Sequence, residues 1–391
     1  MISTSIDKKI KTLSRCFERE ATIRNDVRYD LLGGKAGEIY FKHYYGKYRE
    51  REFSLEEDLV ILSSRLSVYP HISGSLSGLA GVYTLLKKMQ GNYPASGEVD
   101  KFTRQLEMLC LKSLRECLRQ RNFDFLHGAT GLVHALATHR TCLDKAIPDY
   151  VEALYALYGT PENLLRLSRY NDRKSIYEFT EGYSNSSLAH GISGILVVLS
   201  KLYALRVEPV KCRQVCENLI SLLPAFALNG KDSLYANLLP NPDTPTRLAW
   251  CVGDMGIANA LWQAGSRLLE PRWQEVGVAI MVACAKRVDR QVNQVYDAGI
   301  CHGTAGIAHL FLRFGHATRE PLVEKAAEFW LKETLKSGNS TSGYGGYLAW
   351  QGAEGWKQEY GLLEGIAGIG LCLLGFQDES CMDWDDCLLM S

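Results

Sequence analysis

The chain has 391 residues, of which 44 are lysine or arginine and 44 are aspartate or glutamate, so its formal net charge is zero. A balanced charge gives no general attraction to a polyelectrolyte, and nucleic acid is not an expected ligand. The first twenty residues carry charges every few positions, and no later apolar run is long and uncharged enough to cross a bilayer. We therefore expect a cytoplasmic protein without a membrane span.

Cysteine is frequent, with 12 residues, but its placement does not indicate a disulfide framework. Most cysteines lie singly in apolar helical stretches, such as Cys110 in LEMLCLKSL and Cys284 in MVACAKRV. A reduced thiol in such a stretch behaves as a small hydrophobic side chain. We expect most of these cysteines in the core.

One pattern recurs seven times along the chain: a glycine, two residues, a second glycine and then an apolar run. The first glycines of the seven copies are Gly34, Gly78, Gly128, Gly191, Gly253, Gly303 and Gly365, with spacings of 44, 50, 63, 62, 50 and 62 residues. A pattern repeated at such intervals is typical of a repeat architecture.

The segments between the copies predict helices in chain order, since they have helical periodicity. They include DKFTRQLEMLCLKSLRECL from Asp100, VKCRQVCENLISLL from Val210 and LVEKAAEFWLKETL from Leu322. The runs after the glycines, such as GILVVLSKLYAL from Gly194, are apolar nearly all round and predict inner helices. We expect one all-α domain over residues 1–391, in which seven hairpins of inner and outer helices close into a ring. Glycines at the inner-helix starts would let neighbouring helix ends approach closely.

Two stretches fall outside this periodicity. Residues 160–187 form the most polar and least periodic internal stretch, which makes them a candidate lid or peptide-contact loop. The last residues, QDESCMDWDDCLLMS from Gln377, are acidic and aromatic. They are either a disordered tail or a segment that folds back over one end of the domain.

Residues at matching offsets before each glycine pair should converge, because each pair would start an inner helix at the same end of the ring. Cys251 and Cys301 lie two positions before the first glycine of the fifth and sixth copies. His302, His190 and His127 lie one position before it in the sixth, fourth and third copies. Asp124 and Arg247 lie four and six positions before it in the third and fifth copies.

Two thiolates and one imidazole suit zinc and leave a fourth tetrahedral position open, as in catalytic zinc sites. Cys251, Cys301 and His302 therefore predict one Zn²⁺ per chain. A lone cysteine or histidine in an apolar context is more often a core residue, and we expect this of His134 and His309. We expect the same of His316, because these three histidines lie inside or after helices rather than at the shared offset.

Two other classes of function remain open on the residues alone. A glycosidase-like pair of carboxylates would rest on Asp124 and Glu364, the acidic residues at the loop offsets, but it leaves the cysteine and histidine set unexplained. A related zinc enzyme acting on prenyl groups is a variant of that reading. A non-enzymatic scaffold would instead use a structural zinc and bind peptides or thiols such as glutathione.

The sequence resembles the lanthionine synthetase C family over essentially the whole chain. The resemblance rests on RLAWCVGDMG from Arg247, GICHGTAG from Gly299, LAHGISG from Leu188 and FDFLHGATG from Phe123. It implies an α/α-toroid of seven inner and seven outer helices, with zinc bound by Cys251, Cys301 and His302. It also implies that the catalytic histidine, aspartate and arginine are His190, Asp124 and Arg247.

The activity implied by the resemblance is the addition of peptide cysteine thiols to dehydroalanine or dehydrobutyrine, which forms lanthionine or methyllanthionine thioether rings. The expected partners are a dehydrated precursor peptide and, in the same pathway, a dehydratase and a transporter, and we expect a monomer. An addition of glutathione-type thiols is the alternative within the family.

In this reading His190 protonates the α-carbon after the thiolate attacks, and Asp124 orients His190 and holds its charged form. Arg247 would hold Asp124 or stabilise negative charge on the substrate carbonyl. Two positions depart from the family pattern. Val252 stands where an aromatic residue is frequent, and His127 stands where some relatives have a carboxylate.

Overall fold

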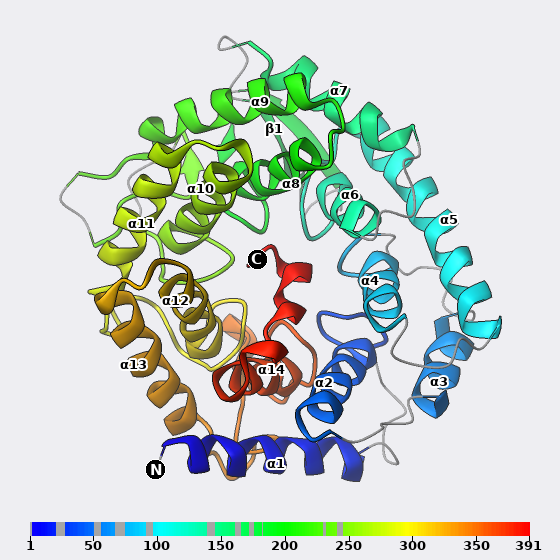
Figure 1. Cartoon of the computed structure of the whole chain (residues 1–391), viewed down its shortest axis with the longest axis vertical. Coiled ribbons are helices and arrows are strands. Elements are labelled where there is room, and N and C mark those ends of the chain that lie inside the picture. Colours follow the sequence, from blue (N-terminus) through cyan, green and yellow to red (C-terminus); the bar gives the residue numbers. More distant parts are fainter. Residues whose placement is uncertain are drawn as a thin grey trace. The chain divides into compact units, whose positions relative to one another are not determined.

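The computed structural model describes residues 2–20, 28–50, 56–66, 75–90, 97–138, 145–160, 166–171, 176–181, 183–229, 232–240 and 245–391. These residues are mostly helical (Figure 1). None of the helices within them is long and apolar enough to span a bilayer.

Seven helices begin directly after the first glycine of the seven glycine pairs. They are α2 (Lys35–Tyr48), α4 (Leu79–Met89), α6 (Ala129–Thr138), α8 (Ile192–Ala204), α10 (Asp254–Leu268), α12 (Thr304–Thr318) and α14 (Ile366–Gln377). In α8, ten of the thirteen residues are buried, namely every position from Ile192 to Ser200 and Leu202, so all sides of the helix are covered. The predicted helix starts and the predicted buried character of these helices are confirmed.

A second set of seven helices alternates with the first along the chain. They are α1 (Ile2–Glu20), α3 (Glu56–Leu66), α5 (Gly97–Arg119), α7 (Ala146–Tyr158), α9 (Pro209–Leu222), α11 (Pro271–Ala285) and α13 (Pro321–Ser337). Helix α13 buries Val323, Ala327, Trp330 and Thr334 at helical spacing, whereas its charged side chains face outward. Proline is the first residue of α9, α11 and α13, where its missing N–H leaves no helical bond unmade.

The chain contacts fall into two compact units. One unit contains residues 74–76 and 105–287, and in it α8 packs against α6, α9 and α10, while α10 packs against α11. The other contains residues 1–73, 77–104 and 288–391, and in it α14 packs against α1, α2 and α12. The first and last repeats of the chain are thus neighbours within that second unit. The prediction of one domain over residues 1–391 stays a prediction.

Short strands supplement the helices. Strand β1 (Arg166–Asn171) pairs with β2 (Ile176–Glu181), β3 (Ser184–Asn185) with β4 (Leu238–Leu239), and β5 (Ala349–Trp350) with β6 (Trp356–Lys357), all antiparallel. The stretch 160–187, for which no strand was predicted, therefore contains a hairpin. Its segment IYEFTE is rich in the β-branched and aromatic residues that strands favour, a signal that the helical pattern of the chain obscured. Residues 161–165, 172–175 and 182 lie outside the described residues, and the lid function stays a prediction.

The C-terminal segment folds back, which decides between the two alternatives left open by its sequence. It forms the 3₁₀ helices η4 (Glu379–Cys381) and η5 (Asp383–Leu388) and buries Trp384. The buried carboxylate of Asp385 accepts hydrogen bonds from His309 Nε2 at 2.7 Å and from Arg313 Nε at 2.6 Å. His309 is therefore a structural residue, as predicted.

Most cysteines other than the two at the loop offsets follow the expectation of a reduced core. Eleven cysteines of the described residues are free, and Cys110 and Cys284 are buried among them. Burial raises the pKa of the Cys110 thiol to about 12, so this thiol stays protonated at neutral pH. The twelfth, Cys142, lies outside the described residues.

Candidate active site

The loops before α2, α6, α12 and α14 fold back onto the first turn of their own helices. We call the loops that precede the glycine-started helices the entrance loops: residues 122–128, 185–191, 246–253, 297–303 and 359–365 carry the predicted site residues and their neighbours. In the third copy the Ala129 N–H donates to the Asn122 carbonyl at 2.9 Å, and in the sixth the Thr304 N–H donates to the Asp297 carbonyl at 3.1 Å. These two entrance loops therefore close onto their helices through the same backbone hydrogen bond, which explains why their offsets are equivalent.

The glycines are needed because of this fold-back. A Cβ on Gly306 would overlap the carbonyl oxygen of Ile300, which belongs to the entrance loop of the same repeat. Gly253 has φ +81°, in the region that other residues rarely adopt. The expectation that the glycines bring neighbouring repeats together holds at Gly256, where a Cβ would lie 3.0 Å from Leu188 Cβ, but the closest crowding is mostly within one repeat.

Backbone hydrogen bonds also join the entrance loops of successive repeats. The N–H groups of Leu188 and Ala189 both donate to the Cys251 carbonyl at 3.1 Å. The N–H groups of Ile300 and Cys301 both donate to the Leu363 carbonyl, at 2.8 and 2.9 Å. Backbone hydrogen bonds to the loop of an adjacent repeat thus hold the peptide groups of Cys251 and Cys301. The Cα positions of both cysteines therefore have little freedom.

The structure brings His190 and Asp124 together, as the resemblance implied. His190 Nδ1 lies 2.8 Å from Asp124 Oδ2, and the carboxylate makes the ring nitrogen the donor. Loss of hydration lowers the pKa of His190, but the hydrogen bond and the charge of Asp124 outweigh that effect, and the pKa lies above its ordinary value of 6.5. The His190 side chain is 40% exposed, so the ring is both supported by a carboxylate and accessible.

Arg247 lies on the same entrance loop as Cys251 and is half-buried. A buried ion pair between Asp254 and Arg287 holds the backbone of this loop. Asp254 accepts hydrogen bonds from the N–H groups of Leu234 and Tyr235 at 3.0 Å and from Arg287 Nη1 at 2.8 Å. Arg287 also donates to the Thr246 carbonyl at 2.8 Å, next to Arg247. Burial raises the pKa of Asp254 although these donors stabilise its charged form.

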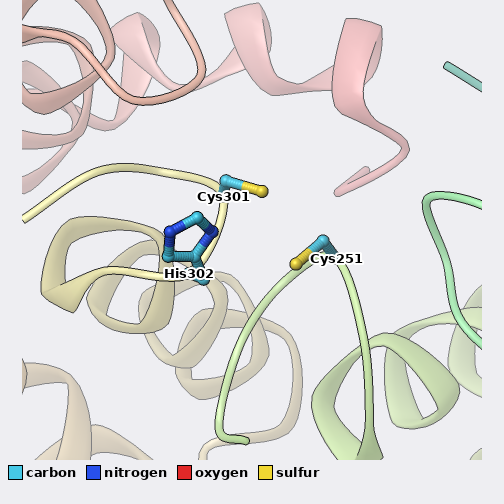
Figure 2. A group of neighbouring side chains, drawn as sticks. All are labelled: Cys251, Cys301 and His302. Carbon is cyan, nitrogen blue, oxygen red and sulfur yellow. The ribbon is translucent and has the colours of Figure 1, made fainter. Parts of the chain in front are cut away.

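Cys251, Cys301 and His302 form a cluster. One ligand atom from each residue, a sulfur or a ring nitrogen, lies within 4.8 Å of the others (Figure 2). Both cysteines are buried, at 8% exposure, and His302 is half-buried. Among the described residues this is the group of three histidine, cysteine or acidic side chains with metal-binding spacing. It contains the two cysteines that lie two positions before the first glycine of their repeats, and the histidine that follows the second of them.

Comparison with known proteins decides the family. A family model described as lanthionine synthetase C-like protein matches residues 27–389. The chain belongs to the lanthionine synthetase C-like family. The predicted resemblance and the predicted class of enzyme, a lanthionine synthetase, are thereby confirmed.

A solved structure of nisin cyclase matches this family member with a TM-score of 0.73, at 18% sequence identity, over 98% of this chain and 97% of that chain. At this identity the match shows the fold. The predicted all-α class and the α/α-toroid architecture are therefore confirmed.

Three side chains that shape the entrance loops of this lanthionine synthetase C-like protein were not predicted. Asn122, Asn185 and Asp297 each lie six residues before the first glycine of their repeat. Each accepts, through its side-chain oxygen, the N–H of the residue two positions on, at 2.8 to 3.1 Å. The shared offset of an Asn or Asp was the signal that could have revealed them.

Proposed function

We propose that this chain is a zinc-dependent peptide cyclase, which adds cysteine thiols of a dehydrated precursor peptide to dehydroalanine or dehydrobutyrine and forms thioether rings. Membership of the lanthionine synthetase C-like family supports the class of reaction. The cluster of Cys251, Cys301 and His302 is the observation that carries the assignment of zinc.

The donor set fits zinc in its chemistry and its spacing. Two thiolates and one imidazole are preferred zinc donors, and Zn–S and Zn–N bonds of about 2.0–2.3 Å place tetrahedral donors roughly 3.5 Å apart. The separations of up to 4.8 Å are close enough for small side-chain rotations to reach that geometry. Cys251, Cys301 and His302 would hold one ion and leave its fourth position to the substrate thiol.

When bound, zinc would lower the pKa of a coordinated thiol and so supply a thiolate at neutral pH, where a free cysteine is mostly protonated. A side chain of the protein must then supply the proton that the α-carbon of the dehydroamino acid gains. The sulfur bonds to the β-carbon, and the electron pair of the double bond must be captured by a proton at the α-carbon. The thiol loses one proton and the α-carbon gains one, so the mass of the peptide does not change.

His190 is the residue that we assign to the protonation of the α-carbon. Its Nδ1 is engaged with Asp124, which leaves Nε2 as the nitrogen that faces substrate. The raised pKa favours the protonated form of the ring, and the exposure of the side chain gives a substrate access to it. Asp124 orients the ring and stabilises its charged form, while Arg247 would stabilise negative charge on the substrate carbonyl.

The test is to measure zinc content and thiol consumption on the same protein samples. We expect about one zinc per chain in the wild type and loss of zinc in Cys301→Ala and His302→Ala. Cys284→Ala is the matched control, because it removes a buried free thiol outside the cluster and should keep its zinc. Full zinc retention in both ligand variants contradicts the site.

Cyclisation is counted as the loss of alkylatable thiols in a dehydrated peptide, because ring closure leaves the mass unchanged. A zinc-loaded wild type that consumes no peptide thiols contradicts the cyclase and favours a scaffold. Consumption of glutathione but not of peptide thiols favours the alternative addition reaction. The proposal expects a cytoplasmic protein, since two cysteine ligands must stay reduced.

A further inference from the structure

His127 occupies the same entrance-loop offset in the third repeat that His190 occupies in the fourth. The two imidazole rings are nearly parallel, with an interplanar angle of 18° and 5.7 Å between the ring centroids. That distance lies within the range of offset-stacked aromatic pairs. The pair is formed by side chains from two loops that are far apart in sequence.

One carboxylate fixes both members of this pair. Asp124 Oδ1 accepts the backbone N–H of His127 at 2.7 Å, and Asp124 Oδ2 is bonded to His190 Nδ1 at 2.8 Å. The carbonyl of His127 accepts a hydrogen bond from Asn122 Nδ2 at 3.0 Å. The backbone of His127 is therefore held at both of its polar groups, and its ring projects from a rigid base.

His190 needs such a support. A single hydrogen bond at Nδ1 fixes one edge of the ring but still permits the plane to tilt about that bond, and a side chain that is 40% exposed has open space on part of its surface. A flat side chain stacked on the ring opposes this tilt. The direction of Nε2, which must be accurate to a fraction of an ångström for proton transfer, then becomes defined.

We propose that His127 is a positioning residue, which holds the ring of His190 by stacking so that Nε2 points at the reacting carbon. The activity test of this inference rests on the proposed function. The positioning role does not depend on a change in the protonation of His127. Desolvation lowers the pKa of His127, the neighbouring His190 acts in the same direction, and Asp124 opposes both. The pKa of His127 is therefore lowered and that of His190 raised, so the two rings do not favour the charged form together.

The activity test compares His127→Ala with His127→Phe. The alanine variant removes the flat ring and should lower kcat on the order of tenfold with little change in KM, because substrate binding is not affected. The phenylalanine variant keeps a ring without nitrogens and should retain most of the wild-type kcat. His316→Ala is the control, since it removes a histidine that pairs with Glu379 elsewhere in the fold. Equal loss in His127→Phe and His127→Ala, or no loss in His127→Ala, overturns the proposal.

A second measurement does not depend on the reaction. The chain has nine histidines, so their ring signals can be assigned by single substitutions in a histidine-labelled sample. An aromatic ring shifts the nuclear magnetic resonance signals of a ring stacked on it. His127→Ala removes this ring and should move the His190 signals. His127→Phe keeps a ring beside His190, and the signals should still show the shift that a stacked ring causes. Unmoved His190 signals in His127→Ala overturn the proposal. If His127→Ala does not fold, His127→Leu replaces it as the variant without a flat ring.

These readouts separate the two proposals. A wild type that cyclises no peptide would contradict the proposed function, and the nuclear magnetic resonance comparison would still decide the stacking. Equal rates of peptide cyclisation by the wild type and by His127→Ala would leave the cyclase proposal intact and contradict the positioning role of His127.

Discussion

Two histidine–aspartate pairs in this protein have nearly the same geometry and different environments. His190 Nδ1 lies 2.8 Å from Asp124 Oδ2, and His309 Nε2 lies 2.7 Å from Asp385 Oδ2. The His190 side chain is 40% exposed, whereas those of His309 and Asp385 are fully buried and Asp385 also pairs with Arg313. The contact alone does not distinguish the pair that we propose to be catalytic from the buried one, and their access to solvent does.

The position of each histidine in its repeat explains this difference. His190 lies on an entrance loop, one residue before the helix-starting glycine. His309 lies inside α12, where its ring also packs 4.7 Å from the ring of Trp384. A loop residue can present one ring nitrogen to a substrate, while a residue inside a buried helix has both ring edges enclosed by protein.

The largest effect that we expect is the loss of stability in Asp385→Asn. The substitution leaves His309 and Arg313 facing a neutral group in a buried site, which typically costs about 3 kcal/mol or more. The loss is measured as the change in the free energy of unfolding by denaturant. The control is Glu328→Gln, whose exposed pair with Lys332 should contribute no more than about 1 kcal/mol. A stability of Asp385→Asn equal to that of the control would show that the buried pair contributes little.

The same variant tests the single-domain prediction. Asp385 and Asp124 belong to different compact units. If the chain unfolds as one domain, Asp385→Asn should lower the temperature of one cooperative transition that includes every helix. Two transitions, of which only one moves, would show that the units unfold separately and would contradict the prediction.

The next largest effect is on catalysis. His190→Ala should keep its zinc and its helical content and lose turnover on the order of 10²-fold, because proton transfer to the α-carbon is lost. The assay counts free thiols in a dehydrated peptide. Thiol consumption at the wild-type rate by the zinc-loaded variant would exclude His190 from the mechanism. Loss of zinc would instead identify His190 as a ligand.

A smaller effect concerns the pKa of His190. Because the negative charge and hydrogen bond of Asp124 raise this pKa above 6.5, Asp124→Asn should lower the midpoint of the His190 titration observed by nuclear magnetic resonance. A raised pKa in the folded state means that the charged pair stabilises the fold below the ordinary value of 6.5, and that this contribution is lost as the pH rises through the folded pKa. An unchanged midpoint in Asp124→Asn would place the cause of the shift elsewhere.

The smallest effect is the acid sensitivity caused by the buried pair. Burial raises the pKa of Asp385, but His309 and Arg313 outweigh it and hold the pKa below the ordinary value of 3.8. The contribution of Asp385 is therefore complete above about pH 4 and is lost as the pH falls through the folded pKa. The stability difference between wild type and Asp385→Asn should shrink below pH 4. A difference that stays constant with pH would contradict the assignment of the charge.

The sequence by itself determined the seven helix starts and the cluster of Cys251, Cys301 and His302. Each helix start depends on a glycine and an apolar run within a few residues, and both signals are local. The metal candidates could be predicted because each repeat has its entrance loop directly before a glycine-started helix, so that a comparison of offsets replaces knowledge of the fold.

The tertiary structure decided the rest. The Asp385 ion pair and the stacking of His127 on His190 join residues more than sixty positions apart, and no local pattern specifies which distant loop will face a given ring. The fold-back of the C-terminal segment has the same cause, since Asp385 is ordered by His309 and Arg313, which lie far away in the sequence. Burial and partners, rather than residue type, separate His190 from His309.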